Sequence, residues 1–283
     1  MAEYHAPVRE MLFVIRDLAG LSRITPLPGY GEATVETAEA ILEQAAELAS
    51  SVISPTNQPG DRQGTRVENG AVVVPDQFKA IYREFQSGGW AGVTSPEEFG
   101  GQGLPFLFGV AIEEMWCSAN LAWSLCPLLT EGAARAIDAH ASQALRQAYL
   151  PKMTAGLWTG TMNLTEPQAG TDLAALRTMA IPEGDHFRVS GQKIFITWGD
   201  HDMTENVVHL VLARLPDAPP GVRGISLFIV PKFLLRADGT PGERNGVRPV
   251  SVEHKLGIHG SPTCVMAFDR ATGYLVGEPN NGL

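Results

Sequence analysis

The feature that most constrains this fold is a change in the spacing of apolar residues close to Met162. Before it, apolar residues recur every three or four positions, which is typical of amphipathic helices. After it, β-branched and aromatic residues stand in short runs bounded by turn residues, which is typical of strands. The change predicts an α+β fold. We expect an N-terminal extension over residues 1–30, an all-α helical domain over residues 31–160, and an antiparallel β-barrel or sandwich over residues 161–283.

The helical pattern is clearest from Val35 onward, with Thr34 as the N-cap. We expect this helix to end at Ser54-Pro55, because a residue before proline avoids the helical region. A loop is expected over residues 58–64, and Pro75 is expected to open a helix that closes at Gly88-Gly89. Further helices are expected over residues 107–117, 121–140 and 143–155. Strands are expected over residues 187–190, 193–196, 207–212, 225–230 and 264–268.

The charge balance argues against a nucleic-acid partner. Acidic residues outnumber basic ones, 31 to 21, for a formal net charge of -10, whereas phosphate binding needs clustered Lys and Arg. The 3 cysteines are too scattered for a disulfide framework, so a cytoplasmic location is the simplest expectation. The N-terminus lacks the pattern of a secretory signal. The apolar run over residues 121–129 is far shorter than the ~20 residues of a membrane span.

Two other kinds of site find little support in the sequence. The histidines at 201, 209, 254 and 259 form no His-Glu-x-x-His pattern and have no cysteine at ligand spacing, so we expect no metal. No serine lies in a Gly-x-Ser-x-Gly pattern, so a hydrolase with a nucleophile elbow is not indicated.

The segment from Met162 to Asp172 joins the two halves. Pro167 and Gly170 interrupt regular structure there, and the segment carries hydroxyls and two acids. One interpretation is an ordinary interdomain turn. The other is a loop that directs backbone N–H groups and threonine hydroxyls at one flat, carbonyl-edged heterocycle.

Two blocks favour the second interpretation. Leu164-Thr165-Glu166-Pro167, followed by Ala169-Gly170-Thr171-Asp172, resembles the flavin-binding signature of acyl-CoA dehydrogenases. Residues 191–197, Gly-Gln-Lys-Ile-Phe-Ile-Thr, are similar to the family's strand beside the isoalloxazine. The family usually has serine at the position of Thr171 and tryptophan at that of Phe195, so a hydroxyl and an aromatic ring are kept.

Further blocks extend the resemblance over residues 30–283. Residues 95–105 look like the family's Pro-Glu-Glu-x-Gly-Gly-x-Gly loop. Residues 209–214, 224–231 and 253–264 are similar to the middle domain of its longer bacterial branch, which includes fatty acyl-CoA and 3-methylmercaptopropionyl-CoA dehydrogenases. The family often has an arginine near Gly260 that reaches a partner subunit's FAD. This chain has Ile258-His259-Gly260-Ser261 there, which puts that contact in doubt.

The resemblance implies an FAD-dependent oxidoreductase of fatty acid β-oxidation that converts an acyl-CoA to its 2-enoyl-CoA. It implies flavin contacts from Met162, Leu164, Thr165, Gly170, Thr171, Phe195, Ile196 and Thr197. It also implies an electron-transfer flavoprotein or similar acceptor, and a homodimer or other homo-oligomer.

No catalytic residue is assigned, because the family's glutamate base belongs to a C-terminal helical bundle that we expect to be absent from this chain. The chain is therefore expected to be inactive alone. Two alternatives stay open: a flavin- or acyl-CoA-binding module without turnover, and a structural subunit that has lost the ligand.

Overall fold

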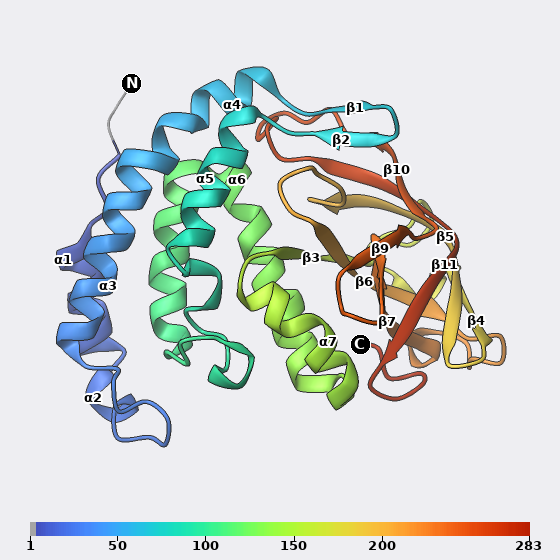
Figure 1. Cartoon of the computed structure of the whole chain (residues 1–283), viewed down its shortest axis with the longest axis horizontal. Coiled ribbons are helices and arrows are strands. Elements are labelled where there is room, and N and C mark those ends of the chain that lie inside the picture. The colour runs from blue at the N-terminus through green and yellow to red at the C-terminus, as the bar shows by residue number, and fades with distance from the viewer. Residues whose placement is uncertain (1–3) are drawn as a thin grey trace.

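The computed structural model describes residues 4–283, with helices at one end and strands at the other (Figure 1). The helices are α1 (Val8–Phe13), α2 (Leu21–Ile24), α3 (Val35–Glu47), α4 (Asn57–Gln63), α5 (Asp76–Ser87), α6 (Phe106–His140) and α7 (Gln143–Thr154). The strands are β1 (Arg66–Glu68), β2 (Ala71–Val73), β3 (Trp158–Asn163), β4 (Met179–Glu183), β5 (His186–Thr197), β6 (Asn206–Arg214), β7 (Ile225–Pro231), β8 (Phe233–Leu235), β9 (Pro241–Arg244), β10 (Val247–Val252) and β11 (Thr263–Val276). The predicted α+β fold is confirmed.

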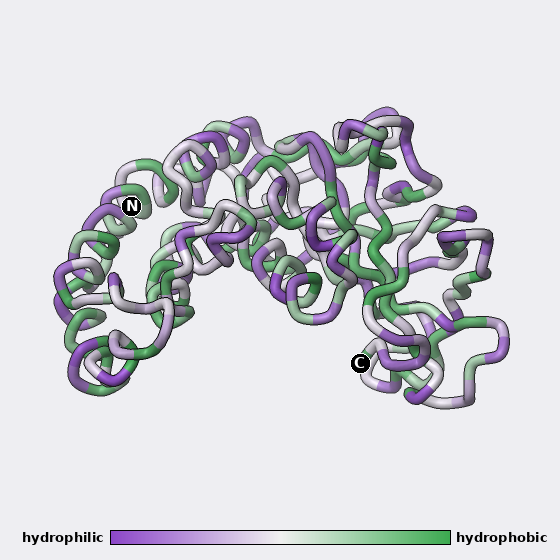
Figure 2. Tube along the Cα trace, turned by 60° about the horizontal axis from the view of Figure 1, so that its bottom comes forward, coloured by the Kyte–Doolittle hydropathy of each residue, from purple (hydrophilic) through white to green (hydrophobic). Residues whose placement is uncertain are grey.

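Capping and amphipathic spacing explain the regular helices. The Thr34 hydroxyl accepts a hydrogen bond from the Thr37 N–H at 3.2 Å, so Thr34 is the N-cap of α3 as predicted. On α3, Ala38, Leu42 and Ala45 face the core. Figure 2 shows hydrophilic and hydrophobic residues alternating along the helical half, as expected for helices with one buried face.

Helix α6 is broken at Asn120, where φ is -158° and ψ is 90°. The Asn120 side-chain oxygen accepts from the Trp123 N–H at 3.2 Å, so Asn120 caps a new helical segment. Its side-chain nitrogen donates to the Thr56 hydroxyl at 3.0 Å. The expectation of two helices with a gap between residues 117 and 121 therefore corresponds to this break.

Two expectations in the helical half are wrong. The backbone stays helical past Pro55, through a wide-turned segment (Leu48–Ile53) and a 3-10 turn (Ser54–Thr56). Pro55 stands in the first turn of its 3-10 helix, where no backbone N–H is required. Residues 58–63 of this predicted loop belong to α4, and Gly64 follows its end. Gly60 allows this helix to lie against Phe78, because a Cβ on Gly60 would come 2.5 Å from the Phe78 ring.

The N-terminal segment is helical and belongs to the main core. Met11, Ile15 and Leu21 are buried in the same hydrophobic cluster as residues of α3, α5 and α6. The boundaries of the expected domains remain predictions. Helix α7 ends at Thr154 and β3 begins at Trp158, so the change from helix to strand comes just before Met162.

The large sheet closes on itself. Strand β11 pairs with β5, β5 with β4, β4 with β6, β6 with β7, and β7 again with β11. These pairings are antiparallel except for the single pair Met179↔Arg214 between β4 and β6. Strand β10 lies outside β11, and β3 adds to β6 in parallel. The sheet is therefore barrel-like and mainly antiparallel, with two parallel contacts that the sequence did not predict.

Specific contacts join the two halves. The Trp198 indole N–H donates to the Ala122 carbonyl at 3.1 Å, which links β5 to α6. The Val72 N–H donates to Asp200 at 3.0 Å, which links the β1–β2 hairpin to the β half. One hydrophobic cluster runs through both halves, so the junction is packed rather than open. No helix among residues 4–283 is long and apolar enough to cross a membrane.

Candidate functional site

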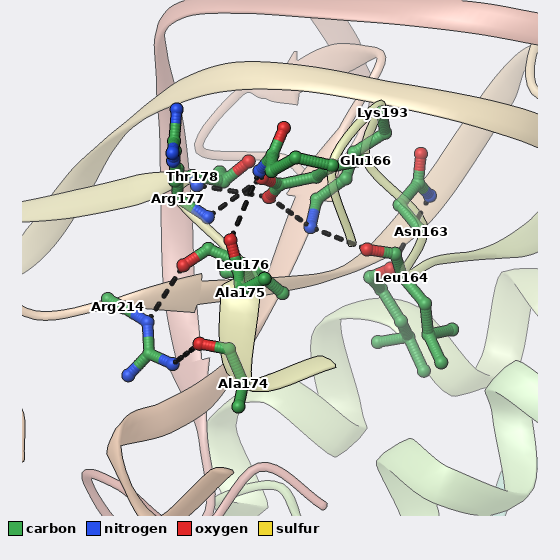
Figure 3. A network of polar contacts seen from close by, with 12 residues as sticks. Asn163, Leu164, Glu166, Ala174, Ala175, Leu176, Arg177, Thr178, Lys193 and Arg214 are labelled. Atoms are coloured by element: carbon green, nitrogen blue, oxygen red, sulfur yellow. Dashed lines mark hydrogen bonds and ion pairs between the residues drawn. The ribbon is translucent and has the colours of Figure 1, made fainter. Parts of the chain in front are cut away.

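The predicted flavin segments meet where β3 and β5 end. The Ile194 N–H donates to the Thr165 carbonyl at 2.9 Å, so the loop after β3 lies directly against β5. The Lys193 ammonium reaches from β5 to the Leu164 carbonyl, also at 2.9 Å. Figure 3 shows the contact between Lys193 and Leu164 from close by. The structure thus brings together two of the blocks that the sequence analysis singled out.

Glu166 organises the loop. Its backbone forms a reciprocal pair of hydrogen bonds with Ala169, each at 3.0 Å, which closes the turn around Pro167. Its carboxylate accepts from the Arg177 N–H at 2.7 Å, the Thr178 N–H at 3.0 Å and Lys193 at 2.9 Å. Both ends of the segment from residue 164 to residue 178 are therefore fixed to one carboxylate (Figure 3).

The ion pair between Glu166 and Lys193 is buried, with the two side chains 3% and 0% exposed. Burial raises the pKa of Glu166, but a hydrogen bond from Thr178, the charge of Lys193 and the Arg177 N–H outweigh it and hold that pKa at about 2. Burial lowers the pKa of Lys193 to about 8, although Glu166 opposes the shift. Glu166 is therefore ionised at neutral pH, and its carboxylate oxygens are occupied by hydrogen bonds within the protein. Its role is to hold the loop in place.

Arg214 holds the later part of the same loop. Its guanidinium donates to the Leu176 carbonyl and to the Ala174 carbonyl, each at 2.8 Å. It also donates to the Gly221 carbonyl, which ties in the turn before β7. Gly191 allows the end of the loop to lie close to β5, because a Cβ there would come 2.4 Å from the Thr178 hydroxyl. The loop is thus held in place by hydrogen bonds from Lys193 of β5 and Arg214 of β6.

A β-bulge presents Phe195. Strand β5 pairs Lys193 with Met266 and Ile196 with Cys264, so two residues of β5 face the single residue Val265. Such a bulge bends the strand and redirects side chains. Phe195 has φ of 58°, and its side chain is 59% exposed. A large aromatic residue in a left-handed conformation at the surface is uncommon and points to a role outside the core.

Unpaired donors lie close to Phe195 along the backbone, because Thr165 is hydrogen-bonded to Ile194 and Thr197 is two residues further along the chain. Among residues 4–283, the hydroxyls of Thr165 and Thr197 have no hydrogen-bond partner, and neither does the Thr165 N–H. Both side chains are partly exposed. A ligand that offers acceptors along one edge could therefore bind without breaking any bond within the protein.

The other predicted flavin contacts are less closely grouped. Met162 and Leu164 are partly buried beside the hydrophobic cluster of α7 and β6, and Ile196 is buried. Gly170 and Thr171 lie on the exposed side of the turn, and no hydrogen bond within the described chain joins Thr171 to β5. The contacts of all eight residues with a flavin remain predictions.

The histidines serve other purposes. His201 and His209 are buried and bond the Thr159 and Thr161 hydroxyls, each at 2.8 Å. Burial and the nearby charge of Lys232 lower both pKa values to about 3, so the rings are neutral. Within residues 4–283, no group of three or more His, Cys, Asp or Glu side chains is arranged to hold a metal ion.

Lys193 and Arg214 were not singled out from the sequence. The signal for Lys193 was present, because a lysine inside the apolar run of a strand must find an acid if it is buried. The acid was also in view, since Glu166 lies in the other block. Pairing them required knowledge that β5 passes beneath the loop. Arg214 gave no signal, because its partners are backbone carbonyls.

Comparison with known families covers most of the chain. The model of the acyl-CoA dehydrogenase N-terminal domain matches residues 35–157, and that of the middle domain matches residues 161–271. A 3-methylmercaptopropionyl-CoA dehydrogenase of Ruegeria pomeroyi is 49% identical over 99% of this chain and 48% of that protein. The broad-specificity linear acyl-CoA dehydrogenase FadE5 of Mycobacterium tuberculosis is 36% identical over 100% of this chain and 48% of that protein.

A solved structure shows the same fold. An acyl-CoA dehydrogenase of Bacillus anthracis, complexed with FAD, superposes with a TM-score of 0.71 at 22% identity, over 89% of this chain and 39% of that one. The chain spans about half the length of the curated relatives it matches.

Proposed function

Because the chain belongs to the acyl-CoA dehydrogenase family, as its sequence predicted, we propose that it supplies the flavin-binding loop and platform of an FAD-dependent acyl-CoA dehydrogenase. The intact enzyme would oxidise an acyl-CoA thioester to its 2-enoyl-CoA. The observation that carries the proposal is the unpaired N–H and hydroxyl of Thr165 beside the exposed ring of Phe195.

These residues fit an isoalloxazine. Thr165 and Thr197 would donate to the carbonyl and nitrogen edge of the ring, and Phe195 would cover part of one face. The bond from Ile194 to the Thr165 carbonyl would keep donors and platform in register. Bound FAD would supply the acceptor for the hydride that leaves the β-carbon. Gly170, Thr171, Met162 and Leu164 would complete the pocket wall, and Ile196, whose side chain is buried, would take part through its backbone.

The proton from the α-carbon needs a separate base. Of the two acids in the segment from Met162 to Asp172, Glu166 is the buried one; it accepts from two backbone N–H groups and Lys193, and its pKa is held at about 2. A carboxylate with such a pKa is a weak base at neutral pH. We therefore assign no catalytic residue and propose that this chain alone does not turn over acyl-CoA.

The partners are proposed on the same basis. The substrate is an acyl-CoA, and the electron acceptor is an electron-transfer flavoprotein or a similar protein. A homodimer in the cytoplasm stays a prediction. The second candidate function is a flavin- or acyl-CoA-binding module without turnover, which is favoured by the full engagement of Glu166.

A titration tests both candidates. FAD is added to the purified chain, and quenching of flavin fluorescence is followed to saturation. Saturable quenching supports the proposed site, and its absence from a folded chain contradicts it. Acyl-CoA thioesters of different chain length and an artificial electron acceptor are then added. No dye reduction above the free-flavin background is expected. Reduction above that background would show that a base lies within these residues.

A further inference from the structure

We propose that Lys193 is a positioning residue for the flavin, because it holds the Leu164 carbonyl inward and so turns the Thr165 N–H outward toward the cofactor. The inference rests on the proposed function, since the cofactor is the group that the N–H would meet. Lys193 itself is fully buried and would not touch the flavin.

The geometry of the peptide unit carries the argument. The described chain has no cis peptide bond, so the carbonyl of Leu164 and the N–H of Thr165 belong to one trans unit and point in opposite directions. The Lys193 ammonium lies 2.9 Å from that carbonyl oxygen (Figure 3). Fixing the oxygen inward therefore fixes the N–H outward, on the side that lacks a protein partner.

Glu166 makes this arrangement possible. A buried ammonium without a partner would be strongly disfavoured, and the Glu166 carboxylate lies 2.9 Å from Lys193. The same carboxylate binds the N–H groups of Arg177 and Thr178, where the loop returns to β4. The pair thus sets the orientation of one peptide and anchors the far end of the loop at once.

If the ion pair only stabilised the fold, the effects of its replacement on stability and on FAD affinity would change together. Replacing a buried ion pair by neutral residues of similar size is often nearly neutral for stability, whereas removal of one partner is costly. The double variant Lys193→Met/Glu166→Gln should therefore regain much of the stability that Lys193→Met loses, although glutamine offers one oxygen where Glu166 accepts from Thr178 at Oε1 and from Arg177 at Oε2. It lacks the donor to Leu164, whereas Glu166→Gln alone keeps that donor. A positioning role therefore predicts that the double variant binds FAD more weakly than Glu166→Gln alone, while its stability is higher than that of Lys193→Met.

The experiment measures the midpoint of urea unfolding and the FAD dissociation constant, by flavin fluorescence, on the same preparations. Lys193→Met should lose both stability and affinity. The double variant should regain much of the lost midpoint and still bind FAD about tenfold more weakly than the unsubstituted chain, as expected for one misdirected donor. Restored affinity in the double variant would overturn the proposal.

A second buried pair provides the matched control. Lys232 lies 2.6 Å from Asp200, with side chains 10% and 2% exposed, and the pair's other hydrogen bonds join the His201 carbonyl and the Val72 N–H rather than the loop. Lys232→Met/Asp200→Asn should leave the FAD dissociation constant within about twofold of the original. If this control weakened FAD binding as much as the variant at Lys193, the effect would be general and the positioning role would be excluded.

Two further arms keep the test decisive. If Lys193→Met/Glu166→Gln does not fold, Lys193→Gln/Glu166→Gln replaces it, because it keeps a pair of amides but is too short to reach Leu164. If the unsubstituted chain binds no FAD, the proposed function fails, and hydrogen exchange over residues 164–169, which excludes the backbone N–H groups bound by the Glu166 carboxylate, decides the inference. Faster exchange in the double variant than in the control at Lys232 supports the hold on Leu164, and unchanged exchange overturns it.

Discussion

The Ile194 N–H donates to the Thr165 carbonyl at 2.9 Å, and this bond joins strand β5 to the loop that follows β3. The bond occupies the backbone carbonyl of Thr165, whereas the backbone N–H and the side-chain hydroxyl of Thr165 stay unpaired. The side chain of Thr165 therefore contributes nothing to the hydrogen bonding of the folded chain, although it stands at the centre of the site.

Thr165→Val and Thr197→Val should leave stability unchanged and weaken FAD binding. Valine keeps the shape of threonine and removes only the hydroxyl, which has no partner among residues 4–283. Loss of one neutral donor costs about 0.5–1.5 kcal/mol, which corresponds to a dissociation constant roughly two- to tenfold higher. Fluorescence titration with FAD checks this. Unchanged affinity in both variants would count against the proposed site.

Phe195→Gly should be more stable than Phe195→Ala, while both lose FAD affinity. At φ of 58° a residue with a Cβ is strained, and glycine relieves about 1 kcal/mol of that strain. Both variants remove the exposed ring equally, so their FAD affinities should match. Urea unfolding and FAD titration separate the two effects. Equal stabilities would mean that the left-handed backbone at this position carries no strain.

The overall fold was predictable because it depends on local patterns. Thr34 as a cap and the change of spacing near Met162 are both visible in the sequence, and both appear in the structure. Helix α4 was not predictable, since Pro59 and Gly60 favour a loop. There, contact with Phe78 decides the outcome, and that contact depends on the tertiary fold.

Stability should fall as the pH is lowered from about 6.5 toward 3, because of His201 and His209. Both pKa values are about 3 in the folded chain and 6.5 in the unfolded chain. Above pH 6.5 both imidazole rings are neutral in the folded and in the unfolded chain, so their titration does not reduce the stability. Below it the unfolded chain takes up protons that the folded chain does not, at about 1.4 kcal/mol per pH unit for each ring. Urea unfolding at pH 7.5 and 5.0 measures the loss.

His209→Gln is the matched variant for this prediction. Its amide can bond the Thr161 hydroxyl but cannot titrate. The loss of stability between pH 7.5 and 5.0 should then be about half that of the unsubstituted chain. An equal loss would assign the pH dependence to other groups. Glu166 should not contribute in this range, because its folded pKa of about 2 lies below its ordinary value of 4.5, so its contribution is lost only as the pH falls below 4.5.

Gly101→Ala should destabilise the chain by about 1–3 kcal/mol or more. A Cβ at Gly101 would lie 2.0 Å from the Ser95 carbonyl oxygen, inside the loop before α6. Gly132→Ala is the control, because a Cβ there meets nothing within 4 Å on helix α6. It should stabilise the chain by up to about 1 kcal/mol. A neutral result at Gly101 would show that this loop can rearrange.

The candidate site was only partly predictable. Thr165 and Phe195 were found by resemblance, but the physical reasons for their availability were not visible. The free donors of Thr165 depend on Lys193 and Ile194, which reach the loop from a strand later in the chain. The exposure of Phe195 depends on the mismatch between β5 and β11. Contacts between strands distant in sequence decide both.

The bulge in β5 makes the site sensitive to chain length as well as to composition. Before it, Lys193 points inward to the loop, and after it, Ile196 points into the core. Alternation along an unbroken strand would place these two residues on opposite faces. The extra residue of the bulge shifts the alternation by one position, so both side chains point inward. Deletion of Ile194 or Phe195 would therefore turn Ile196 and Thr197 over together. Among descendants of this sequence, losses of a residue here should be rare.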